Sequence, residues 1–384
     1  MTVFYEVPPL LHMKMRKIKI LHIISSLRRG GGQLLLSSLV ANHDPEQFEY
    51  HVISLVEGGE VATDIRNYGV SVIELDFSSV MGSMISMYKL LTIIKGCRPD
   101  LVHTWMYHAD LIGGVASLLV AKRKIIWGIH HADPKTTKIP TMIIAKICGL
   151  ISGVVPSKII ACSALSADSH VKYGYSESRI NVIENGINLS SFRPARNDRV
   201  VDAYENVVIG HVARWHLIKG HEIFIKAAGI VYQKFPESRF VMVGSGVDWD
   251  NAVLVNWLKQ AGITDVVELY SDRTDIPVVM NLFDIYVSSS RSESFSLTLV
   301  EAMACGVPCV ATRTGVAEEI VGESLRVVEV DDVDHMARSI EDLVKLPALK
   351  RREIGRDGIK LIKERFDEKE MIFKYEQLYQ QVAS

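Results

Sequence analysis

The stretch Ile18–Gln33, IKILHIISSLRRGGGQ, sets the pattern on which the rest of the chain is built. Its first part, Ile18–Ile24, is short and rich in β-branched residues, which predicts a buried strand. Three glycines, Gly30–Gly32, then precede a helical pattern over Gln33–Ala41. Glycines at a helix N-terminus let an anion approach the backbone N–H groups, although a flexible connection is the alternative. The segment does not fit G-x-G-x-x-G, so it does not support dinucleotide binding.

Strand-like and helix-like segments alternate after this stretch, and the same rhythm restarts after residue 206. Such alternation predicts parallel sheets with helices on both faces, and 384 residues are enough for two domains of this kind. The further strands that we expect are Tyr50–Leu55, Val70–Leu75, Leu101–His103, Ile125–Ile129, Lys158–Cys162, Val207–Val212, Arg239–Val243, Val266–Leu269, Asp284–Val287, Cys309–Ala311 and Arg326–Val330. The expected helices include Ser83–Lys95, His221–Lys234, Asn251–Ala261, Leu297–Cys305 and Asp367–Ser384.

We therefore expect an α/β protein with two doubly wound, Rossmann-like domains that face each other across a cleft. After a tail at 1–16, the N-terminal domain spans 17–190 and the C-terminal domain spans 207–367. The polar segment 191–206 is the expected linker. Open parallel sheets bind ligands beyond the carboxyl ends of their strands, so residues that directly follow strands are the functional candidates.

Composition limits the class of protein. The chain is 48% hydrophobic with a formal net charge of −2, which excludes a disordered chain and gives no general attraction to nucleic acid. Residues 1–190 carry 19 Lys and Arg against 15 Asp and Glu, which is compatible with an anionic acceptor or a membrane surface. Five scattered cysteines without a C-x-x-C pair predict a cytoplasmic protein without disulfides or structural zinc. Peripheral contact with the inner face of the membrane stays open.

The strongest candidate for a membrane span is Ile139–Ile160. Pro140, Lys146, Pro156 and Lys158 interrupt it, so no run of 18 apolar residues is left. We expect a buried helix here, with a surface amphipathic element as the alternative.

The segment Ser292–Pro308, SESFSLTLVEAMACGVP, carries two glutamates eight positions apart. Glu293 lies before an expected helix, and Glu301 lies within its first turns. A carboxylate ahead of a helix N-terminus can bind hydroxyl groups next to a phosphate. For Glu301, a capping box with Thr298 is the alternative.

Two cations follow the first strand of the second half. Arg214 and Lys219 lie on the loop before Gly220, where a guanidinium fork and an ammonium group suit a diphosphate. Two solvated loop charges are the alternative. Gly244 follows the strand Arg239–Val243 and indicates either backbone approach to a nucleotide or a tight turn.

Histidines follow two strands of the first half. His103 ends one strand, and His130 ends another, so both belong to the carboxyl edge of the first sheet and can act as hydrogen-bonding or acid–base groups. We expect acceptor-binding residues among His103, Trp105, His108 and His131, with core packing as the alternative for Trp105. A zinc site is disfavoured because no further ligand stands at a suitable spacing.

Asp248 and Asp250 resemble a D-x-D metal motif of some sugar transferases. They also stand at the start of an expected helix, where Asp caps free N–H groups. We favour capping and expect no metal site.

These motifs follow one another along the chain in the order typical of one family. In this respect the sequence resembles retaining glycosyltransferases of the GT-B fold, in family 4 (group 1). The resemblance covers nearly the whole chain from Lys17. Its hallmark is the E-x7-E element at Glu293 and Glu301, and the NG element at Glu184–Asn188 falls in the expected order. It implies a donor bound mainly by the C-terminal domain, an acceptor bound mainly by the N-terminal domain, and a C-terminal helix at about 368–384 that crosses back to the N-terminal domain.

The resemblance also implies roles for individual residues. Arg214 and Lys219 would bind the donor diphosphate and, with His130 and Glu293, are the expected catalytic residues. Glu293 would bind the transferred sugar, and Glu301 would bind the ribose. The other implied donor-binding residues are Gly31, Gly32, Gly244, Arg273, Phe295, Ser296 and Leu297.

The activity implied is retaining, metal-independent transfer from a UDP- or GDP-sugar to a hydroxyl of a glycan, a lipid-linked molecule or a small molecule, without a resident cofactor. Two alternatives remain open, a nucleotide-sugar 2-epimerase and a non-catalytic nucleotide-binding relative. Ser271 stands where similar proteins usually have a glycine, which leaves the contact to the base open.

Overall fold

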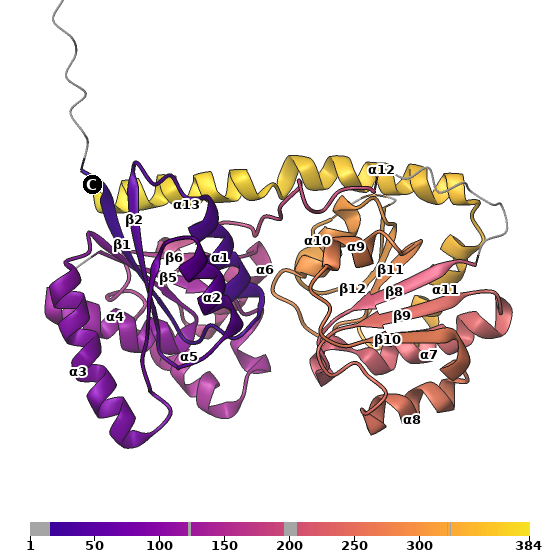
Figure 1. Ribbon diagram of the computed structural model, residues 1–384, viewed down its shortest axis with the longest axis horizontal. Coiled ribbons are helices and arrows are strands. Elements are labelled where there is room, and N and C mark those ends of the chain that lie inside the picture. The colour runs from indigo at the N-terminus through magenta and orange to yellow at the C-terminus, as the bar shows by residue number, and fades with distance from the viewer. Residues whose placement is uncertain (1–15, 122–123, 196–205, 321, 323) are drawn as a thin grey trace, which may run out of the picture.

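The chain folds into two parallel β-sheets, each covered by helices (Figure 1). The computed structural model describes residues 16–121, 124–195, 206–320, 322 and 324–384. Within these residues the first sheet has seven strands in the order β3-β2-β1-β4-β5-β6-β7, and the second has six in the order β10-β9-β8-β11-β12-β13. Both orders turn back at their first strand, which is the doubly wound topology. The predicted fold class is confirmed.

The first domain alternates strands and helices along the chain. Its strands are β1 (Ile18–Ile24), β2 (Phe48–Ser54), β3 (Ser71–Glu74), β4 (Leu101–Trp105), β5 (Lys124–Ile129), β6 (Lys158–Ala161) and β7 (Ile180–Val182). Its helices are α1 (Gly31–Asn42), α2 (Glu60–Asn67), α3 (Val80–Cys97), α4 (Tyr107–Ala121), α5 (Ile139–Ile151) and α6 (Ala164–Tyr173), with 3₁₀ turns η1 (Pro134–Thr136) and η2 (Glu177–Arg179).

The second domain repeats this arrangement. Its strands are β8 (Val208–Val212), β9 (Arg239–Val243), β10 (Val267–Tyr270), β11 (Ile285–Ser288), β12 (Cys309–Thr312) and β13 (Leu325–Val328). Its helices are α7 (His221–Lys234), α8 (Ala252–Ala261), α9 (Ile276–Met280), α10 (Leu297–Ala304) and α11 (Val333–Val344), with 3₁₀ turns η3 (Leu217–Lys219), η4 (Thr264–Val266) and η5 (Gly315–Glu318). Two more helices, α12 (Ala348–Arg365) and α13 (Glu368–Ala383), end the chain.

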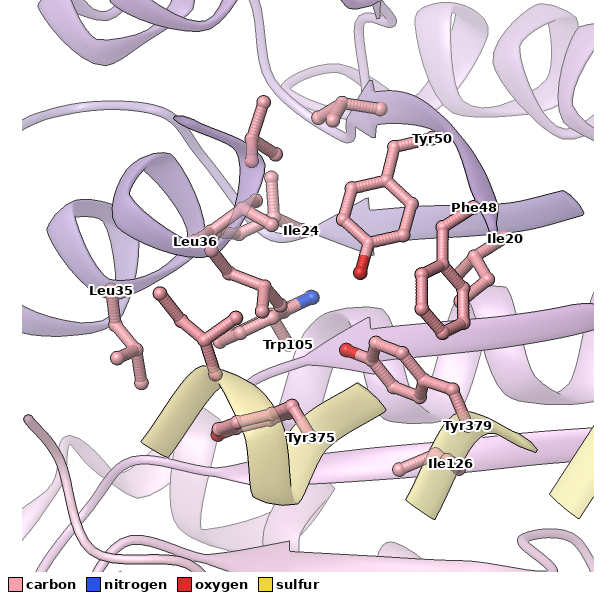
Figure 2. Packing of buried hydrophobic residues seen from close by; sticks show 14 of the residues in the cluster. Ile20, Ile24, Leu35, Leu36, Phe48, Tyr50, Trp105, Ile126, Tyr375 and Tyr379 are labelled. Atoms are coloured by element: carbon pink, nitrogen blue, oxygen red, sulfur yellow. The ribbon is translucent and has the colours of Figure 1, made fainter. Parts of the chain in front are cut away.

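Alternation along β1 divides the first core into two layers. Ile20 and Ile24 pack on the side of α1, α2 and α13, whereas Leu21 and Ile23 pack on the side of α3 and α4. A parallel sheet needs both layers because its strands are buried on both faces. Figure 2 shows that α13 contributes Tyr375 to the first layer, so the end of the chain completes the core of the N-terminal domain.

The helices α12 and α13 run along both domains and carry the chain back to the first one (Figure 1). At their junction, Arg365 donates to the carboxylate of Glu184 at 2.5 Å and also to that of Glu319, so one guanidinium joins the two domains. Gly186 packs so closely that a Cβ there would lie 2.5 Å from the Cα of Glu368. The predicted crossing helix is confirmed.

The predicted strands agree with the observed ones to within two residues at each end. The three-residue edge strand β7 was missed because it is too short for a periodic pattern. The predicted helices also did not include α2, α4, α6, α9, α11 and α12. Of the predicted tail at 1–16, all but Arg16 lies outside the described residues. Residues 196–205 of the expected linker 191–206 lie outside them as well.

The prediction of a buried helix over Ile139–Ile160 is wrong. The helix α5 ends at Ile151, and Ile139, Ile143 and Leu150 are 55–75% exposed. They are exposed because α5 covers the outside of the sheet and buries only its other side. No helix in the described part of the chain combines the length and the apolar character that a membrane crossing requires.

The hydroxyl group of Tyr379, on α13, contacts the imidazole ring of His103 in the core. The hydroxyl oxygen lies 2.7 Å from Nδ1 of His103, and both side chains are fully buried. Tyr379→Phe would leave a buried ring nitrogen without its partner, so we expect the free energy of unfolding to fall by about 1–3 kcal/mol. Urea denaturation checks this. The matched control is Tyr88→Phe at an exposed position, with an expected change within about 0.5 kcal/mol. Equal losses in the two variants would contradict the role of the bond.

Candidate active site between the two domains

The glycine loop lies at the carboxyl edge of the first sheet and faces the second domain. The helix α1 begins at Gly31, and no side chain caps its first N–H groups. A Cβ on Gly31 would lie 3.7 Å from Leu297 of the second domain, and one on Gly32 would lie 3.5 Å from the ring of His130. Free N–H groups and the helix dipole favour an anion at this point.

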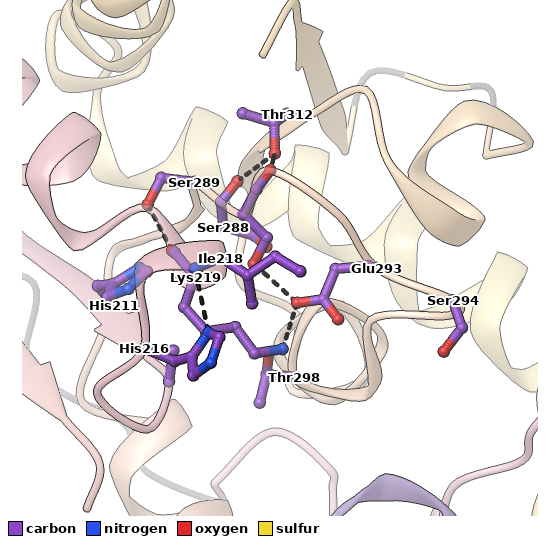
Figure 3. A network of polar contacts seen from close by, with 12 residues as sticks. His211, His216, Ile218, Lys219, Ser288, Ser289, Glu293, Ser294, Thr298 and Thr312 are labelled. Carbon is purple, nitrogen blue, oxygen red and sulfur yellow. Dashed lines mark hydrogen bonds and ion pairs between the residues drawn. The ribbon is translucent and has the colours of Figure 1, made fainter. Parts of the chain in front are cut away.

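Lys219 and Glu293 form an ion pair in the second domain (Figure 3). Lys219 ends η3, and its Nζ lies 2.6 Å from Oε1 of Glu293. The hydroxyl of Ser290 donates to the same oxygen at 2.7 Å. The side chains of Lys219 and Glu293 are 23% and 14% exposed, so the pair is largely screened from water yet open on one side. The second oxygen of Glu293 accepts no hydrogen bond from the described residues and is left for a ligand.

Two glycines hold the loop that carries the cations. Gly220 has φ of 65°, and a Cβ there would lie 1.9 Å from the carbonyl oxygen of Ser289. Gly244 has φ of 153°, and a Cβ there would lie 2.1 Å from the carbonyl oxygen of Ala213. Arg214 is exposed and forms no ion pair within the part of the chain that the structure describes. Its guanidinium is thus available to a phosphate.

Cations from both domains gather around His216. Partial burial lowers its pKa, and Arg214, Lys219 and Lys138 lower it further. Lys138 belongs to the first domain and precedes α5. Three cations from the two domains therefore lie near one another at this point, which favours the binding of an anion such as a diphosphate.

The helix α10 begins with a residue in a strained conformation. Ser296 is its N-cap with φ of 67°, and the hydroxyl oxygen is buried without a partner in the described residues. This conformation costs a residue with a Cβ roughly 1–3 kcal/mol. Among the described residues, the backbone N–H groups of Phe295, Ser296 and Leu297 donate to no acceptor. Uncapped N–H groups at a helix N-terminus suit a phosphate.

The capping box that was the alternative for Glu301 is absent. Thr298 lies inside the helix, and its Oγ1 accepts a hydrogen bond from the hydroxyl of Tyr286 at 2.8 Å. Glu301 has no hydrogen-bond or ion-pair partner within the described residues, and burial raises its pKa to about 7. A partly buried carboxylate without a partner is suited to accept hydroxyl groups from a ligand.

Direct contacts bring the candidates of the two domains together. The hydroxyl of Ser294 donates to the backbone oxygen of His130 at 3.1 Å. Ser163, the N-cap of α6, donates to the backbone oxygen of Ser294 at 2.8 Å. With the approach of Gly31 to Leu297, these contacts gather the glycine loop, His130 and the start of α10 into one site.

His130 follows β5 and packs on Trp105, with ring centroids 5.0 Å apart and planes 8° apart. Both ring nitrogens are buried and have no partner among the described residues. Burial lowers the pKa of His130 to about 3, with a smaller contribution from His131. The ring is therefore neutral at pH 7 and can donate one hydrogen bond and accept another.

The four acceptor candidates fall into two environments. His103 and Trp105 are fully buried beneath α13, where His103 binds Tyr379. They have no surface for an acceptor in this conformation, so burial contradicts their prediction, and core packing accounts for Trp105. His108 and His131 are partly buried, and burial lowers the pKa of His131 to about 4. These two stay acceptor predictions.

The D-x-D segment forms a turn before α8. The carboxylate of Asp248 accepts the backbone N–H groups of Asp250 and Asn251, both at 3.1 Å. Asp248 therefore shapes the turn, and the side chain that caps α8 is that of Asn251, which accepts the N–H of Leu254 at 3.2 Å. All five cysteines carry free thiols, and the described residues contain no group of three side chains that could hold a metal ion.

Arg273 lies on the exposed loop after β10. Its Nε and Nη2 donate to the carboxylate of Asp275 at 2.6 and 2.5 Å. The hydroxyl of Ser271 accepts the N–H of Gly246 at 3.4 Å, which links this loop to the glycine turn after β9. The donor-binding role of Arg273 stays a prediction, and the contact of this loop to a nucleotide base stays open.

Two family models match successive parts of the chain. One is described as Glycosyltransferase Family 4 and matches residues 29–191, and the other is described as Glycosyl transferases group 1 and matches residues 196–361. The chain belongs to the group 1 glycosyltransferases. The two matches cover the glycine loop, His130 and all donor candidates of this glycosyltransferase.

Known proteins resemble the glycosyltransferase over most of its length. It is 25% identical over 344 residues to UDP-Gal:alpha-D-GlcNAc-diphosphoundecaprenol alpha-1,3-galactosyltransferase of Escherichia coli, covering 84% of this chain and 87% of the relative. It is 28% identical over 277 residues to D-inositol 3-phosphate glycosyltransferase of Paenarthrobacter aurescens, covering 64% of each chain. The structure of Anabaena Alr3699/HepE in complex with UDP and glucose matches with a TM-score of 0.82 at 22% identity, covering 95% of this chain and 100% of that one.

Several residues of the site were not predicted. Ser163 and Ser290 each follow a strand closely, and Lys138 precedes a helix at the same edge of the first sheet. The rule that ligands bind beyond strand ends could have found the two serines. The left-handed conformation of Ser296 has no signal in the sequence, because that region of the backbone usually calls for glycine.

Glu301→Gln tests whether the unpaired carboxylate lowers the stability of the ligand-free protein. The folded-state pKa of about 7 lies above the ordinary value of 4.5, so the folded state binds more protons between these pH values and loses stability as the pH rises through them. We expect the variant to be more stable than the wild type by about 1–3 kcal/mol at pH 8 and equal to it near pH 4. Denaturation across this pH range checks the difference.

The matched control is Glu370→Gln on the exposed side of α13. We expect its stability relative to the wild type to stay constant with pH. A constant difference for Glu301→Gln as well would show that its carboxylate is not destabilised by burial.

Proposed function

We propose that this glycosyltransferase moves a sugar from a nucleoside-diphosphate donor to a hydroxyl group of a glycan or lipid-linked acceptor and retains the anomeric configuration. The observation that carries the proposal is the Lys219–Glu293 pair, which lies beside the uncapped start of α10. A cation, a carboxylate and free N–H groups at one place suit a sugar joined to a diphosphate. The relative named for UDP-Gal and a diphosphoundecaprenol acceptor makes a UDP-hexose the first donor to test.

Each group would bind one part of the donor. Arg214 and Lys219 would bind the diphosphate together with the N–H groups of α10 and the glycine loop. The free oxygen of Glu293 would accept hydroxyl groups of the transferred sugar. Glu301 would accept those of the ribose, which would remove the cost of its unpaired carboxylate.

The proposed reaction proceeds on one face of the sugar. The bond from the anomeric carbon to the β-phosphate oxygen breaks while the acceptor oxygen bonds to the same carbon from the same side. The acceptor proton passes to the departing phosphate oxygen, so no protein base is needed. The protein supplies position and stabilises the negative charge that develops on the leaving group.

His130 would take part as a neutral hydrogen-bonding group. Its pKa of about 3 makes it unable to act as an imidazolium acid at neutral pH. Stacking on Trp105 fixes the ring plane. His130 would therefore orient a sugar hydroxyl or a phosphate oxygen near the reacting carbon. Its ring would not change protonation state during turnover.

Arg214→Ala and Lys219→Ala test the diphosphate site. We expect each to lower transfer by ~10²-fold or more, on the scale of one lost charge-stabilising donor. Transfer from a panel of UDP- and GDP-sugars to glycan and lipid-linked acceptors provides the measurement. The matched control is Lys226→Ala on α7, which removes only an exposed pair with Glu222, and its activity should stay within about twofold of the wild type. Near-normal turnover in both test variants would remove the diphosphate assignment.

We also propose that transfer needs no divalent metal, because Arg214, Lys219 and the α10 N-terminus provide the positive groups that a metal supplies in other transferases. Activity in excess chelator should therefore match that of the untreated enzyme. Loss of transfer that manganese restores would assign a metal-binding role to Asp248 and Asp250.

A further inference from the structure

Exposed apolar side chains gather on one part of the first domain. Ten of the 22 large apolar residues that are exposed in the described chain lie between residues 81 and 154. Those of α5 follow one another at intervals of three or four residues, which places them on one side of the helix. We call the set the α3–α5 face, and it consists of Met81, Met84, Ile85, Tyr88, Leu119, Ile139, Ile143, Ile147, Leu150 and Val154.

The three helices of the α3–α5 face are neighbours. The helix α4 packs against α3 on one side and against α5 on the other, and all three cover the sheet face opposite α13 (Figure 1). Leu119, Leu150 and Met81 are 75–76% exposed, so nothing in the described chain covers this face. Isolated exposed apolar residues are ordinary, but such a concentration marks an interaction surface.

The charge around the face is mainly positive, with the carboxylate of Asp76 beside Gly82 at the start of α3. Residues 81–158, leaving aside 122 and 123, contain eight Lys and Arg and three Asp and Glu. The acidic ones are occupied, since Asp110 is buried, Asp100 pairs with Arg16 and Asp133 caps η1. The lysines are not neutralised, because Lys89, Lys95, Lys124, Lys135, Lys138 and Lys146 form no ion pair within the described residues.

We propose that the α3–α5 face binds the surface of a lipid bilayer that contains anionic lipids. Apolar side chains on one side of a helix with lysines beside them are the features of helices that lie in the membrane interface. A second copy of the chain would set lysine against lysine, whereas an anionic bilayer matches both the apolar area and the charge. This inference concerns where the protein works and goes beyond the proposed transfer reaction.

The placement of the face relates it to the candidate active site. The helices α3, α4 and α5 each begin at the carboxyl edge of the first sheet, the edge that also carries His130 and the glycine loop. Met81, Met84 and Ile139 lie in the first turns of α3 and α5 and therefore at this end. A bilayer bound here would lie beside the acceptor side of the site.

Vesicle cosedimentation of the full chain tests the proposal without reference to catalysis. We expect the protein to bind vesicles of phosphatidylglycerol and phosphatidylcholine, weakly at high salt, and to bind pure phosphatidylcholine poorly. Ile143→Ser with Ile147→Ser should lower the partition coefficient at least about tenfold. Lys89→Gln and Lys135→Gln should each lower it by about fivefold on anionic vesicles alone.

Matched controls come from the second domain. Leu349→Ser with Val253→Ser removes two apolar side chains that are 67% and 52% exposed, against 55% and 40% for Ile143 and Ile147. Lys360→Gln with Lys363→Gln removes two exposed charges. These variants should bind vesicles like the wild type. Thermal melts of all variants verify that the exposed substitutions leave the fold intact.

Three outcomes would overturn the proposal. The first is failure of the wild type to bind anionic vesicles at low salt, and the second is equal loss of binding in test and control variants. The third is a dimer, seen by analytical ultracentrifugation, that Ile143→Ser with Ile147→Ser abolishes while vesicles remain unbound, which would assign the face to a second copy. Because the measurement is binding alone, its failure leaves the transfer proposal standing, and inactive Arg214→Ala would leave vesicle binding intact.

Discussion

The packing of α13 into the first domain is the constraint on which the site depends. Tyr375 and Tyr379 belong to the core of that domain, although they follow the whole second domain in the sequence. Arg365 links Glu184 and Glu319 where the chain crosses. Where α12 and α13 carry the chain back to the first domain, the second domain is held so that Leu297 and Ser294 lie against the glycine loop and His130. Groups more than a hundred residues apart thus come within contact distance.

The polar groups that meet at this contact lower the stability of the protein when no ligand is bound. Glu301 is partly buried and unpaired, the hydroxyl of Ser296 is buried without a partner, and both nitrogens of His130 lack partners among the described residues. Each such group lowers the stability of the ligand-free protein. At the contact between the two domains these three groups are placed where a polar ligand can pair with them, so that stability is given up there for the ability to bind polar molecules.

The sequence alone predicted the sheets well because buried parallel strands leave short, β-branched runs that differ clearly from helical patterns. Spacing after strands marked Glu293, Arg214 and Lys219 one by one, and the resemblance to the family placed them in one donor site, where Lys219 and Glu293 do pair. The sequence alone could not distinguish His103 from His130, since both end strands, and only the position of α13 shows that His103 is buried. It also misjudged α5, because an apolar stretch shows the same composition whether it packs inward or faces outward. The burial of His103 and the exposure of α5 both depend on how distant segments pack, so the local sequence does not determine them.

The ion pair between Lys219 and Glu293 joins recognition to chemistry. One oxygen of Glu293 binds Lys219 and Ser290, and the other is free among the described residues. Under the proposed function, the free oxygen would bind a sugar hydroxyl while the bound one keeps the ammonium group in place for the diphosphate. A sugar without that hydroxyl would leave a shielded carboxylate oxygen unpaired, which is unfavourable. The same carboxylate would then select the sugar and position the cation that stabilises the departing diphosphate. Changes at Glu293 that alter sugar selectivity would therefore also change the rate of transfer.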